Sequence, residues 1–362
     1  MKILFIAPVP PPITGHSLAS KVFLDYISPF SSIEVVNLSK QSFKGGADTY
    51  NRFFEIGILL KQIVQKKRNK DLIYLTISES LAGNIKDLFI YLICFRKLPK
   101  TYIHLHGGSI RELLFDKYSI IKWLNRYFYK RIGGVIVLGK SHISIFDDLI
   151  SKEKIHIIPN FAEDYLFTSE INIRNKFISN DKIKILFLSN LITGKGYNEI
   201  VDAFLGLDIE LKQKLTIDFA GAFESEDDKN IFLYKIKDIN EIKYHGIVSG
   251  QRKKQLFDMA HVFILPTSLY EGQPISILEA YASGCTVAVT NSGGICDIFQ
   301  DNINGFEIIN QSPFEIREVM KKMIDKKELL LQFAIENCKI AKQKYTMFIY
   351  NNSLQNVLSI KV

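Results

Sequence analysis

The segment HVFILPTSLYEGQPISILEAYASGCTVAVTN, residues 261–291, contains the pattern that decides the fold. Two short apolar runs, at 261–267 and 286–291, are separated by a stretch whose apolar residues have helical spacing. Continuous β-branched runs with a helix between them are typical of parallel strands that are covered on both faces. The segment therefore predicts a strand–helix–strand unit of an open parallel sheet.

The same alternation runs along nearly the whole chain. It predicts strands at residues 2–9, 33–38, 71–77, 100–106, 134–139, 154–160, 182–190, 214–221, 241–247, 261–267, 286–291 and 305–309. Helical stretches are expected at 17–28, 81–95, 109–131, 312–344 and 347–360. The pattern is interrupted at 161–181, which we interpret as a linker. A chain of 362 residues is long for one core, so we expect two doubly wound α/β domains joined near residue 170.

Composition excludes several classes of protein. With 47% hydrophobic and 23% charged residues, the chain has the composition of a soluble globular protein. The best apolar run, LFIYLICF (88–95), ends at Arg96 and is far shorter than the ~20 residues that cross a bilayer. The first residues predict a strand and not an export signal. The four cysteines lack CxxC spacing, so neither a zinc site nor a disulfide framework is indicated, and we expect a reducing cytoplasm.

The positive charge lies in the N-terminal half. Residues 1–165 contain 23 Lys and Arg against 14 Asp and Glu, whereas the rest of the chain contains 23 against 24. Two clusters, 61–70 and 122–131, mix bases with apolar side chains. Each is either a solvated helix face or a surface that docks onto anionic lipid head groups. Nucleic-acid binding is a weaker choice, because no recognisable binding module accompanies the charge.

Ligands of open parallel sheets bind where strands end, so the loops after the strands are the candidate sites. After the first strand, Gly15 allows a close backbone approach, and Thr14 or Ser17 can cap the next helix. His106 follows another strand and precedes two glycines. Lys195 stands between two glycines before a helix, where an amine and backbone amides favour anions. The alternatives are a plain turn, a structural histidine and a surface lysine.

Two glutamates flank the start of the helix in the opening segment. Pro274 suits a first helical position, and Gly284 suits the position beyond the helix end. Amides of 273–276 would point at a diphosphate. Glu271 can accept hydrogen bonds from sugar hydroxyls. Glu279 lies in an apolar turn and needs a partner, which a ribose diol would supply. The alternative is that both glutamates serve the helix dipole and solubility.

Together these motifs resemble the retaining glycosyltransferase family four. EGQPISILEAYASG (271–284) is similar to the family's segment of two glutamates separated by seven residues, and SNLITGKG (189–196) resembles its donor-phosphate loop. Further similar segments follow in the family's order: HGIVSGQRKKQLFDMAHVFILPT (245–267), NSGGICD (291–297) and NGF (304–306). The N-terminal half resembles the family more loosely, through the Gly15 turn and the His106 strand end.

The resemblance implies the GT-B fold, in which two Rossmann-like domains face each other across a nucleotide-sugar cleft. It implies an acceptor-binding domain at 1–168, a nucleotide-sugar-binding domain at 169–346 and a C-terminal helix, 347–362, that returns to the first domain. It also implies that no metal and no cofactor is bound, since the nucleotide sugar is a co-substrate and cationic side chains and amides replace a magnesium ion.

The resemblance assigns roles to single residues. Glu271, Lys195 and His106 would be catalytic. Glu271 would hold the donor sugar, and Lys195 would neutralise the diphosphate. His106 would lie at the sugar face, near the acceptor. Glu279 would hold the ribose, and the segment at Gly246, Ile247 and Val248 would contact the base. The remaining donor-binding residues are Gly15, Asn190, Gln273, Pro274 and Ile275.

One position departs from the family pattern. The family commonly has an arginine five residues before the lysine, and this chain has Asn190 there. Either Arg252 or Lys253 supplies the missing charge at the diphosphate, or the site relies on Lys195 and amide dipoles.

By this resemblance the chain transfers a sugar with retention to a saccharide acceptor, expected to be lipid-linked, in surface polysaccharide or O-antigen biosynthesis. No enzymatic nucleophile is evident, which agrees with attack from the front face. We expect a cytoplasmic protein, peripheral on the inner face of the cell membrane through its basic half, with no nucleic-acid partner. The alternatives are a GT-B-fold nucleotide-sugar epimerase and a non-catalytic nucleotide-sugar-binding protein.

Overall fold

The computed structural model describes residues 1–39, 49–178 and 182–361, which form two compact units. The first unit consists of Met1–Asn160, Glu271–Gln273 and Phe348–Val362, and the second of Phe161–Tyr270 and Pro274–Met347. The chain thus changes unit at 160/161, where the sequence suggested 168/169. Ala162 already belongs to the second unit, because it is buried in that unit's core and its N–H donates to the carbonyl of Tyr345 at 2.8 Å.

The first unit is a six-stranded parallel sheet in the order β2-β1-β3-β4-β5-β6. Its strands are β1 (Lys2–Ala7), β2 (Ser32–Asn37), β3 (Leu72–Thr76), β4 (Thr101–His104), β5 (Gly134–Val137) and β6 (Ile155–Ile157). Its helices are α1 (Gly15–Ile27), α2 (Thr49–Lys66), α3 (Leu81–Ile93), α4 (Ser119–Tyr129) and α13 (Met347–Val357). A 3₁₀ segment, η1 (Phe95–Lys100), follows α3, and a π-helical turn, η2 (Arg111–Phe115), precedes α4.

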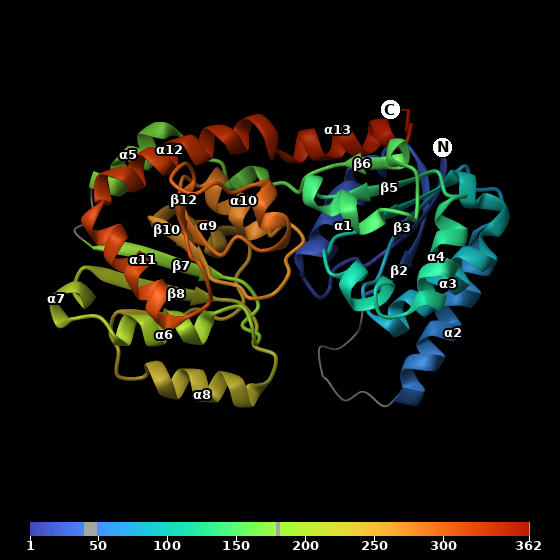
Figure 1. Ribbon diagram of the computed structural model, residues 1–362. Helices are drawn as coiled ribbons and strands as arrows, with labels where there is room; N and C mark the ends of the chain where they lie inside the picture. Colours follow the sequence, from blue (N-terminus) through green and yellow to red (C-terminus); the bar gives the residue numbers. More distant parts are fainter. Residues whose placement is uncertain (40–48, 179–181, 362) are drawn as a thin grey trace. The chain divides into compact units, whose positions relative to one another are not determined.

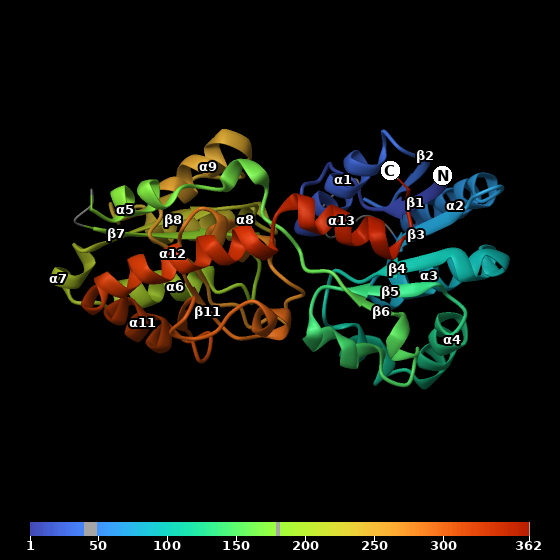
Figure 2. The ribbon, with the colours of Figure 1, turned by 90° about the horizontal axis from the view of Figure 1, so that it is seen from above.

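Helices cover both faces of this sheet. Figures 1 and 2 show α2, α3 and α4 together on one side, with α1 and α13 on the other. Phe5 on β1 stacks on Tyr74 of β3 and contacts Phe23 of α1, whereas Leu4 and Ile6 belong to the core below the other helices. The hydroxyl of Tyr26 on α1 is within hydrogen-bond distance of Asn352 and Gln355 on α13. This double coverage explains why the strands are continuously apolar.

The second unit is also a six-stranded parallel sheet, in the order β12-β11-β10-β7-β8-β9. Its strands are β7 (Ile183–Leu188), β8 (Leu215–Ala220), β9 (Ile242–Tyr244), β10 (Val262–Leu265), β11 (Thr286–Val289) and β12 (Gly305–Glu307). Its helices are α5 (Glu170–Ile178), α6 (Tyr197–Leu205), α7 (Ile209–Lys212), α8 (Glu226–Ile236), α9 (Gly250–Met259), α10 (Ile275–Ala282), α11 (Pro313–Asp325) and α12 (Lys327–Lys344).

In both sheets the order in which successive strands are added reverses direction once. In the first unit this switch lies beside β1, whose neighbours are β2 and β3, and in the second it lies between β7 and β10. The loops after these strands are where ligands of doubly wound sheets bind. The candidate loops of the sequence, after β1, β7 and β10, therefore follow the switch-point strands.

The twelve predicted strands and the α/β class are confirmed. The linker prediction for 161–181 is wrong for the second half of its described part, because α5 (Glu170–Ile178) lies there. The Ser169 hydroxyl accepts a hydrogen bond from the N–H of Asn172, which caps the helix, and Ile173 and Phe177 are buried one turn apart. Two buried apolar residues in a nine-residue helix are too few to give a visible period in the sequence. Residues 179–181 lie outside the described part.

Candidate donor site and catalytic residues

The loops after β7 and β10 touch at the switch point of the second unit. The N–H of Ser268 and the hydroxyl of Thr267 both donate to the carbonyl of Gly194, at 2.8 and 3.3 Å. Gly194 and Gly196 have φ of +89° and +86°, and a Cβ at Gly196 would collide with the carbonyl of Pro266. Glycine is needed here both for the backbone conformation and for the close approach of the two loops.

Lys195 lies between these glycines and is half-buried. Its N–H closes a turn onto the carbonyl of Ile192 at 3.1 Å, and α6 begins two residues later. The N-cap of α6 is Gly196, which has no capping side chain. The lysine thus precedes a helix whose first N–H groups have no side-chain acceptor, an arrangement that favours an anion. Asn190 is half-buried in the same loop.

Helix α10 also begins without a capping side chain. Pro274 is its N-cap, with φ −62° and ψ 118°, and Ile275 is the first helical residue. The prediction that Pro274 is itself the first helical residue is therefore wrong by one position, because its ψ is extended. Beyond the other end, Gly284 has φ +63°, as predicted for the position after the helix.

Glu279 is buried in α10 and forms an ion pair that the sequence did not predict. Its carboxylate accepts from the ammonium of Lys253 on α9 at 2.6 Å, and the same ammonium is 2.5 Å from Glu163. Glu279 therefore has a partner within the protein, and its burial does not by itself require a ribose. Lys253 is held by two carboxylates and Arg252 lies 3.3 Å from Nδ1 of His245, so each of the two suggested replacements for the missing arginine has a partner within the unit.

The protonation of this carboxylate–ammonium–carboxylate triad, Glu163–Lys253–Glu279, follows from burial and pairing. Burial raises the pKa of Glu279 more than Lys253 lowers it. Burial by itself would lower the pKa of Lys253, but Glu279 and Glu163 together hold it above its usual range. The lysine is therefore charged, and it is the group that opposes protonation of Glu279. Glu163 was missed because it falls in the segment that was interpreted as a linker.

The segment at Gly246, Ile247 and Val248 follows β9. Gly246 has φ +70°, and its carbonyl accepts from the N–H of Gly221 in the loop after β8 at 2.9 Å. Ile247 is 75% exposed, whereas Val248 packs on the core. An exposed aliphatic side chain at a strand end is available to a flat apolar ligand such as a nucleobase.

In the first unit His106 belongs to a cluster of three imidazoles, His16, His104 and His106. The ring centroids of His104 and His106 are 3.9 Å apart, and those of His16 and His106 are 4.3 Å apart. Nδ1 of His104 is 2.6 Å from the hydroxyl of Tyr74. The Nε2 atoms of all three rings are buried without a hydrogen-bond partner among the described residues.

These imidazoles are neutral near neutral pH. The pKa of His104 is lowered to about 3, mainly by burial and to a smaller extent by the neighbouring His16. Burial and then Lys86 lower the pKa of His16 to about 4, and burial with the other two rings lowers the pKa of His106 well below its usual range. A neutral imidazole can donate or accept a hydrogen bond but brings no charge to the site.

Glu271 and Gln273 group with the first unit. Between them, Gly272 lies so close to the carbonyl of His106 that a Cβ would not fit. The carboxamide of Gln273 accepts from the N–H of Asn160 at 2.6 Å and donates to the carbonyl of Leu138 at 3.2 Å. Its side chain is thus engaged, and only its backbone N–H remains for the predicted donor contact. Glu271 is half-buried.

Gly15 is the exposed first residue of α1. The Thr14 hydroxyl accepts from the N–H of Ser17 at 3.1 Å, while the N–H of Thr14 donates to the Ser17 hydroxyl at 2.8 Å. This is a complete capping box in which Thr14, one of the two residues that the sequence offered as a cap, is the N-cap.

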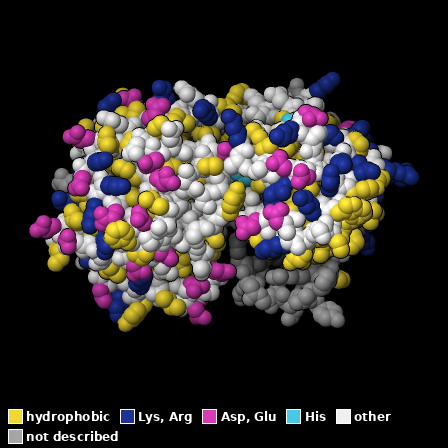
Figure 3. Space-filling model, viewed as in Figure 1, with side chains coloured by type: hydrophobic (Ala, Val, Ile, Leu, Met, Phe, Trp, Pro, Cys, Tyr) yellow, Lys and Arg dark blue, Asp and Glu magenta, His cyan; other side chains and the backbone are white. Residues whose placement is uncertain are grey.

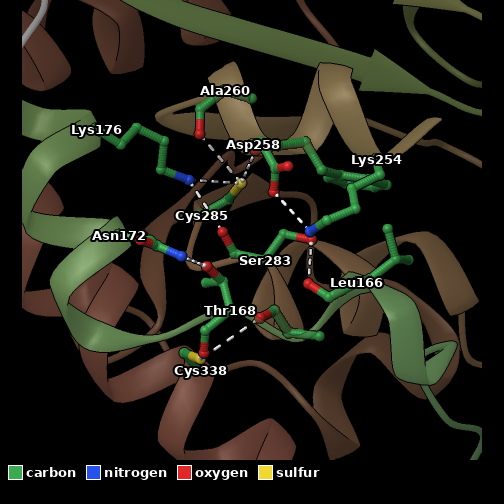
Figure 4. Close-up of polar contacts among 12 residues, drawn as sticks. Leu166, Thr168, Asn172, Lys176, Lys254, Asp258, Ala260, Ser283, Cys285 and Cys338 are labelled. Carbon is green, nitrogen blue, oxygen red and sulfur yellow. Dashed lines mark hydrogen bonds and ion pairs between the residues drawn. The ribbon is translucent and has the colours of Figure 1, made fainter. Parts of the chain in front are cut away.

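A second polar cluster, drawn in Figure 4, lies at the opposite end of the strands of the second unit. It surrounds a pocket of about 250 Å³ next to Lys176, Asp258 and Ser283, just before β10 and β11 begin. Lys176 is buried and donates to the carbonyl of Ser283 at 3.0 Å and to the Cys285 sulfur at 3.7 Å (Figure 4). Burial lowers the pKa of Lys176. These contacts join α5 to the end of α10, so we assign them to stability.

Neither a metal-ion cluster nor a membrane-spanning helix is found in the described part of the chain. Within residues 1–39, 49–178 and 182–361, no three His, Cys, Asp or Glu side chains converge on a position for a metal ion. In the same ranges no helix is both long enough and apolar enough to cross a bilayer.

Comparison with known proteins supports the fold and matches part of the chain to a family. Residues 168–339 match the family model of glycosyl transferases group 1. An uncharacterized glycosyltransferase of Methanocaldococcus jannaschii is 24% identical over 58% of this chain and 54% of its own length. The lipopolysaccharide 1,2-N-acetylglucosaminetransferase of Salmonella typhimurium is 23% identical over 62% of this chain and 59% of its own. The matches thus span little more than half of each of these relatives.

Among solved structures, the Anabaena protein Alr3699/HepE in complex with UDP and glucose superposes with a TM-score of 0.76. It is 18% identical, and the match covers 99% of each chain. This likeness shows that the fold extends over both units. Residues 168–339 therefore match the glycosyl transferases group 1 family, within a chain that has the two-sheet GT-B fold.

Proposed function

We propose that this chain is a glycosyltransferase that moves a sugar, with retention, from a nucleotide-sugar donor to a saccharide acceptor. The observation that carries the proposal is the switch point of the second unit. There the Gly194–Gly196 loop touches the loop after β10, and α6 and α10 both begin without a capping side chain. Two open helix N-termini and a lysine form an arrangement suited to a diphosphate.

In this proposal Lys195 and the amides that follow Pro274, including that of Ile275, bind the diphosphate, with the amides of Gln273 and Gly15 adding hydrogen bonds. Asn190 contributes a neutral amide at the position where the family that the sequence resembles commonly has an arginine. The UDP bound in the Anabaena structure supports a nucleoside diphosphate as the ligand class. The segment Gly246–Val248 would contact the base.

Glu279 would accept hydrogen bonds from the ribose hydroxyls. The triad supports this role, because Lys253 reaches the carboxylate from within the unit and opposes its protonation despite its burial. An ionised, positioned carboxylate is the strongest acceptor that a protein can offer to a diol. Lys253 is thus a positioning residue for Glu279.

The chemical step would break the anomeric C–O bond of the donor, and the bonding electrons would leave with the diphosphate. The acceptor hydroxyl attacks the same face of the oxocarbenium-like carbon and passes its proton to an oxygen of the departing diphosphate. Glu271 would hold the donor sugar, and neutral His106 would hydrogen-bond at the sugar face. Lys195 stabilises the charge that develops on the leaving group, so no metal ion or cofactor is required.

We further propose that the acceptor is a lipid-linked saccharide in surface polysaccharide or O-antigen biosynthesis, and that the chain works in the cytoplasm at the membrane. The Salmonella relative, named for lipopolysaccharide, and the positive charge of residues 1–165 support this. An epimerase of the same fold would need no acceptor, and a non-catalytic binder would turn over no donor.

Binding is tested first, by thermal shift with nucleoside diphosphates and their sugars. A ligand at 100 times its Kd should stabilise the protein by about 2.7 kcal/mol. Lys195→Ala should lose most of this stabilisation, whereas Lys237→Ala, an exposed lysine just after α8, should keep it. If no nucleoside diphosphate stabilises the wild type, the donor site is wrong.

Turnover then separates the three functions. Glu271→Ala and Lys195→Ala should each lower kcat/KM for sugar transfer by at least ~100-fold, the order expected when one electrostatic stabiliser is removed. Near-normal transfer by either purified variant contradicts its role. Donor conversion without acceptor identifies an epimerase, and binding without any conversion identifies a binding protein.

A further inference from the structure

Helices α3 and α4 expose a continuous row of apolar side chains. On α3 and the segment after it the row contains Ile85, Phe89, Leu92 and Phe95, and on α4 it contains Ile120, Trp123 and Tyr127. We call these seven residues the α3–α4 face. Ile120 is 72% exposed, Trp123 63% and Leu92 61%. Figure 3 shows the apolar side chains gathered over these two helices.

The two helices form one surface because buried contacts join them. The carboxamides of Asn84 on α3 and Asn125 on α4 hydrogen-bond to each other in both directions, at 3.2 and 2.8 Å. On the outside, the ring of Tyr127 is stacked with Phe95 and with Trp123, with centroids 6.3 Å apart in both pairs. The face is thus held rigidly from below and contains aromatic rings suited to a membrane–water interface.

A basic groove adjoins this face. Trp123, Arg126, Tyr127, Lys130 and Arg131 line a space of about 360 Å³. The guanidinium of Arg131 lies 3.9 Å from the centre of the Tyr127 ring. Among the residues that the structure describes, no carboxylate pairs with Arg126, Lys130 or Arg131. The groove therefore presents three uncompensated cations beside an apolar surface.

The other basic cluster of the sequence, 61–70, has structural partners instead. Lys66 donates to the carbonyl of Val35 at 2.8 Å, and Lys67 donates to the carbonyl of Ile93 at the end of α3. Lys70 is 5% exposed and is paired with Glu34. The prediction of a lipid-docking surface is therefore not supported for these three lysines, and the structure favours the cluster on α4.

Helix α8 of the second unit provides an internal comparison. It also exposes an aromatic residue beside a cation, since Tyr234 is 72% exposed and the ammonium of Lys237 lies 4.1 Å from its ring. However, the first turn of α8 contains three acidic residues, and its lysines Lys229 and Lys235 pair with carboxylates. An exposed aromatic–cation pair alone thus occurs without a net positive surface.

We propose that the α3–α4 face is the surface by which this chain adsorbs to a bilayer that contains anionic lipids. The apolar row enters the head-group region, and the phosphates of anionic lipids occupy the groove of Arg126, Lys130 and Arg131. Charge complementarity selects this occupant, because the unpaired bases directly border the apolar row. The proposal concerns adsorption and does not depend on the transfer reaction.

Vesicle binding tests the proposal with the full chain and without substrate. The wild type should co-sediment with vesicles of phosphatidylcholine containing about 30 mol% phosphatidylglycerol, and not with phosphatidylcholine alone. Arg126→Gln with Lys130→Gln should weaken binding roughly 25-fold, since each base contributes about fivefold. Trp123→Ala should weaken it about tenfold. The control, Tyr234→Ala with Lys237→Gln at α8, should bind like the wild type.

The single tryptophan supplies a second readout, because Trp123 is the only one in the chain. Its emission should shift to shorter wavelength with anionic vesicles, and brominated lipids should quench it. Binding that leaves Trp123 emission unchanged, or that the α8 control weakens as much as the α4 variants do, overturns the proposal.

Two further outcomes would assign the face to another occupant and also overturn the proposal. If inorganic phosphate or glycerol phosphate alone reproduces the emission shift, the groove is a small-anion site. If the shift depends on protein concentration without lipid and accompanies a dimer in size-exclusion chromatography, a second copy covers the face. All the substituted side chains are exposed, so circular dichroism and melting should remain unchanged.

Discussion

Helices α1 and α10 both follow a switch-point strand, but they begin in opposite ways. In the first unit, Thr14 and Ser17 close the start of α1 with a reciprocal capping box. In the second unit, Pro274 precedes α10 and supplies no side-chain acceptor. A closed helix start stabilises the fold by itself, whereas an open one leaves N–H donors for a ligand. We therefore expect most of the anion-binding capacity in the second unit, with the N–H groups of Gly15 and Gln273 as additional donors from the first.

The buried polar groups near these helices differ in the same sense. The first unit contains three imidazoles that burial keeps neutral, and the second contains the Glu163–Lys253–Glu279 triad, in which pairing keeps Lys253 charged. A neutral polar group costs less to bury than a charged one, which needs a partner. Three experiments can break or sharpen this contrast.

The largest effect is expected for Lys253→Met, which leaves two carboxylates without their cation. The free energy of unfolding should fall by about 3–5 kcal/mol at neutral pH. Because burial raises the pKa of Glu279 in the folded protein, protonation relieves this loss, and the deficit should shrink as the pH falls. Urea unfolding at neutral and at acidic pH measures both.

The matched control is Lys254→Met, on the same helix. Its pair with Asp258, at 3.1 Å, is more exposed, so its removal should cost at most about 1 kcal/mol. Equal losses in the two variants would show that the triad is an ordinary surface pair.

A smaller effect is expected for the imidazoles. Because their pKa values are lowered in the folded state, the unfolded state binds protons first, and stability should fall as the pH drops from 6.5 towards about 4. A folded pKa that lies one pH unit below the unfolded pKa corresponds to about 1.4 kcal/mol. His104→Gln keeps an acceptor for Tyr74 but does not titrate, so its stability should depend less on pH in this range. The control His156→Gln, on β6, should change the pH dependence of stability less than His104→Gln does. If it changes that dependence more, the three-imidazole cluster is not the source of the acid sensitivity.

The smallest effects concern the helix starts. Thr14→Ala should cost about 1 kcal/mol of unfolding free energy, because it opens the capping box. Pro274→Asp adds a cap but loses the proline restraint on the unfolded chain, and these opposing terms of about 0.5–1 kcal/mol should leave stability nearly unchanged.

Pro274→Asp should nevertheless weaken nucleoside diphosphate binding about tenfold, because its carboxylate competes for the amides and repels the ligand. Pro274→Asn adds a cap without charge and should weaken binding less. Calorimetric titration with UDP and GDP measures this. Unchanged affinity in the Asp variant would exclude the start of α10 from the diphosphate site.

Much of this fold could be predicted because its signal is local. Each strand is a short β-branched run, and each candidate loop directly follows one, so the glycine turns, Lys195 and the Thr14 cap were visible in the sequence. Helix α5 was missed because only Ile173 and Phe177 give it an apolar face, together with the stem of Lys176. The one-residue displacement at Pro274 depends on a single ψ angle, which composition does not reveal.

The partners of the buried polar residues could not be predicted. Lys253 meets Glu279 across 26 positions and Glu163 across 90, and Gln273 meets Asn160 across 113. The residues between them give no indication of these contacts. The two basic clusters looked alike in sequence, yet three lysines of one bond to carbonyls or a carboxylate and the other lines an open groove.

The sequence by itself determined two parallel sheets, the loops that end their switch-point strands, and the identity of the residues in those loops. The reason is that strand burial, turn conformation and capping depend on side chains within a few positions. Only the tertiary structure decided which charges are neutralised, which imidazoles stack and which apolar face stays open. Those outcomes depend on desolvation and on contacts between distant segments, which exist only once the chain has folded.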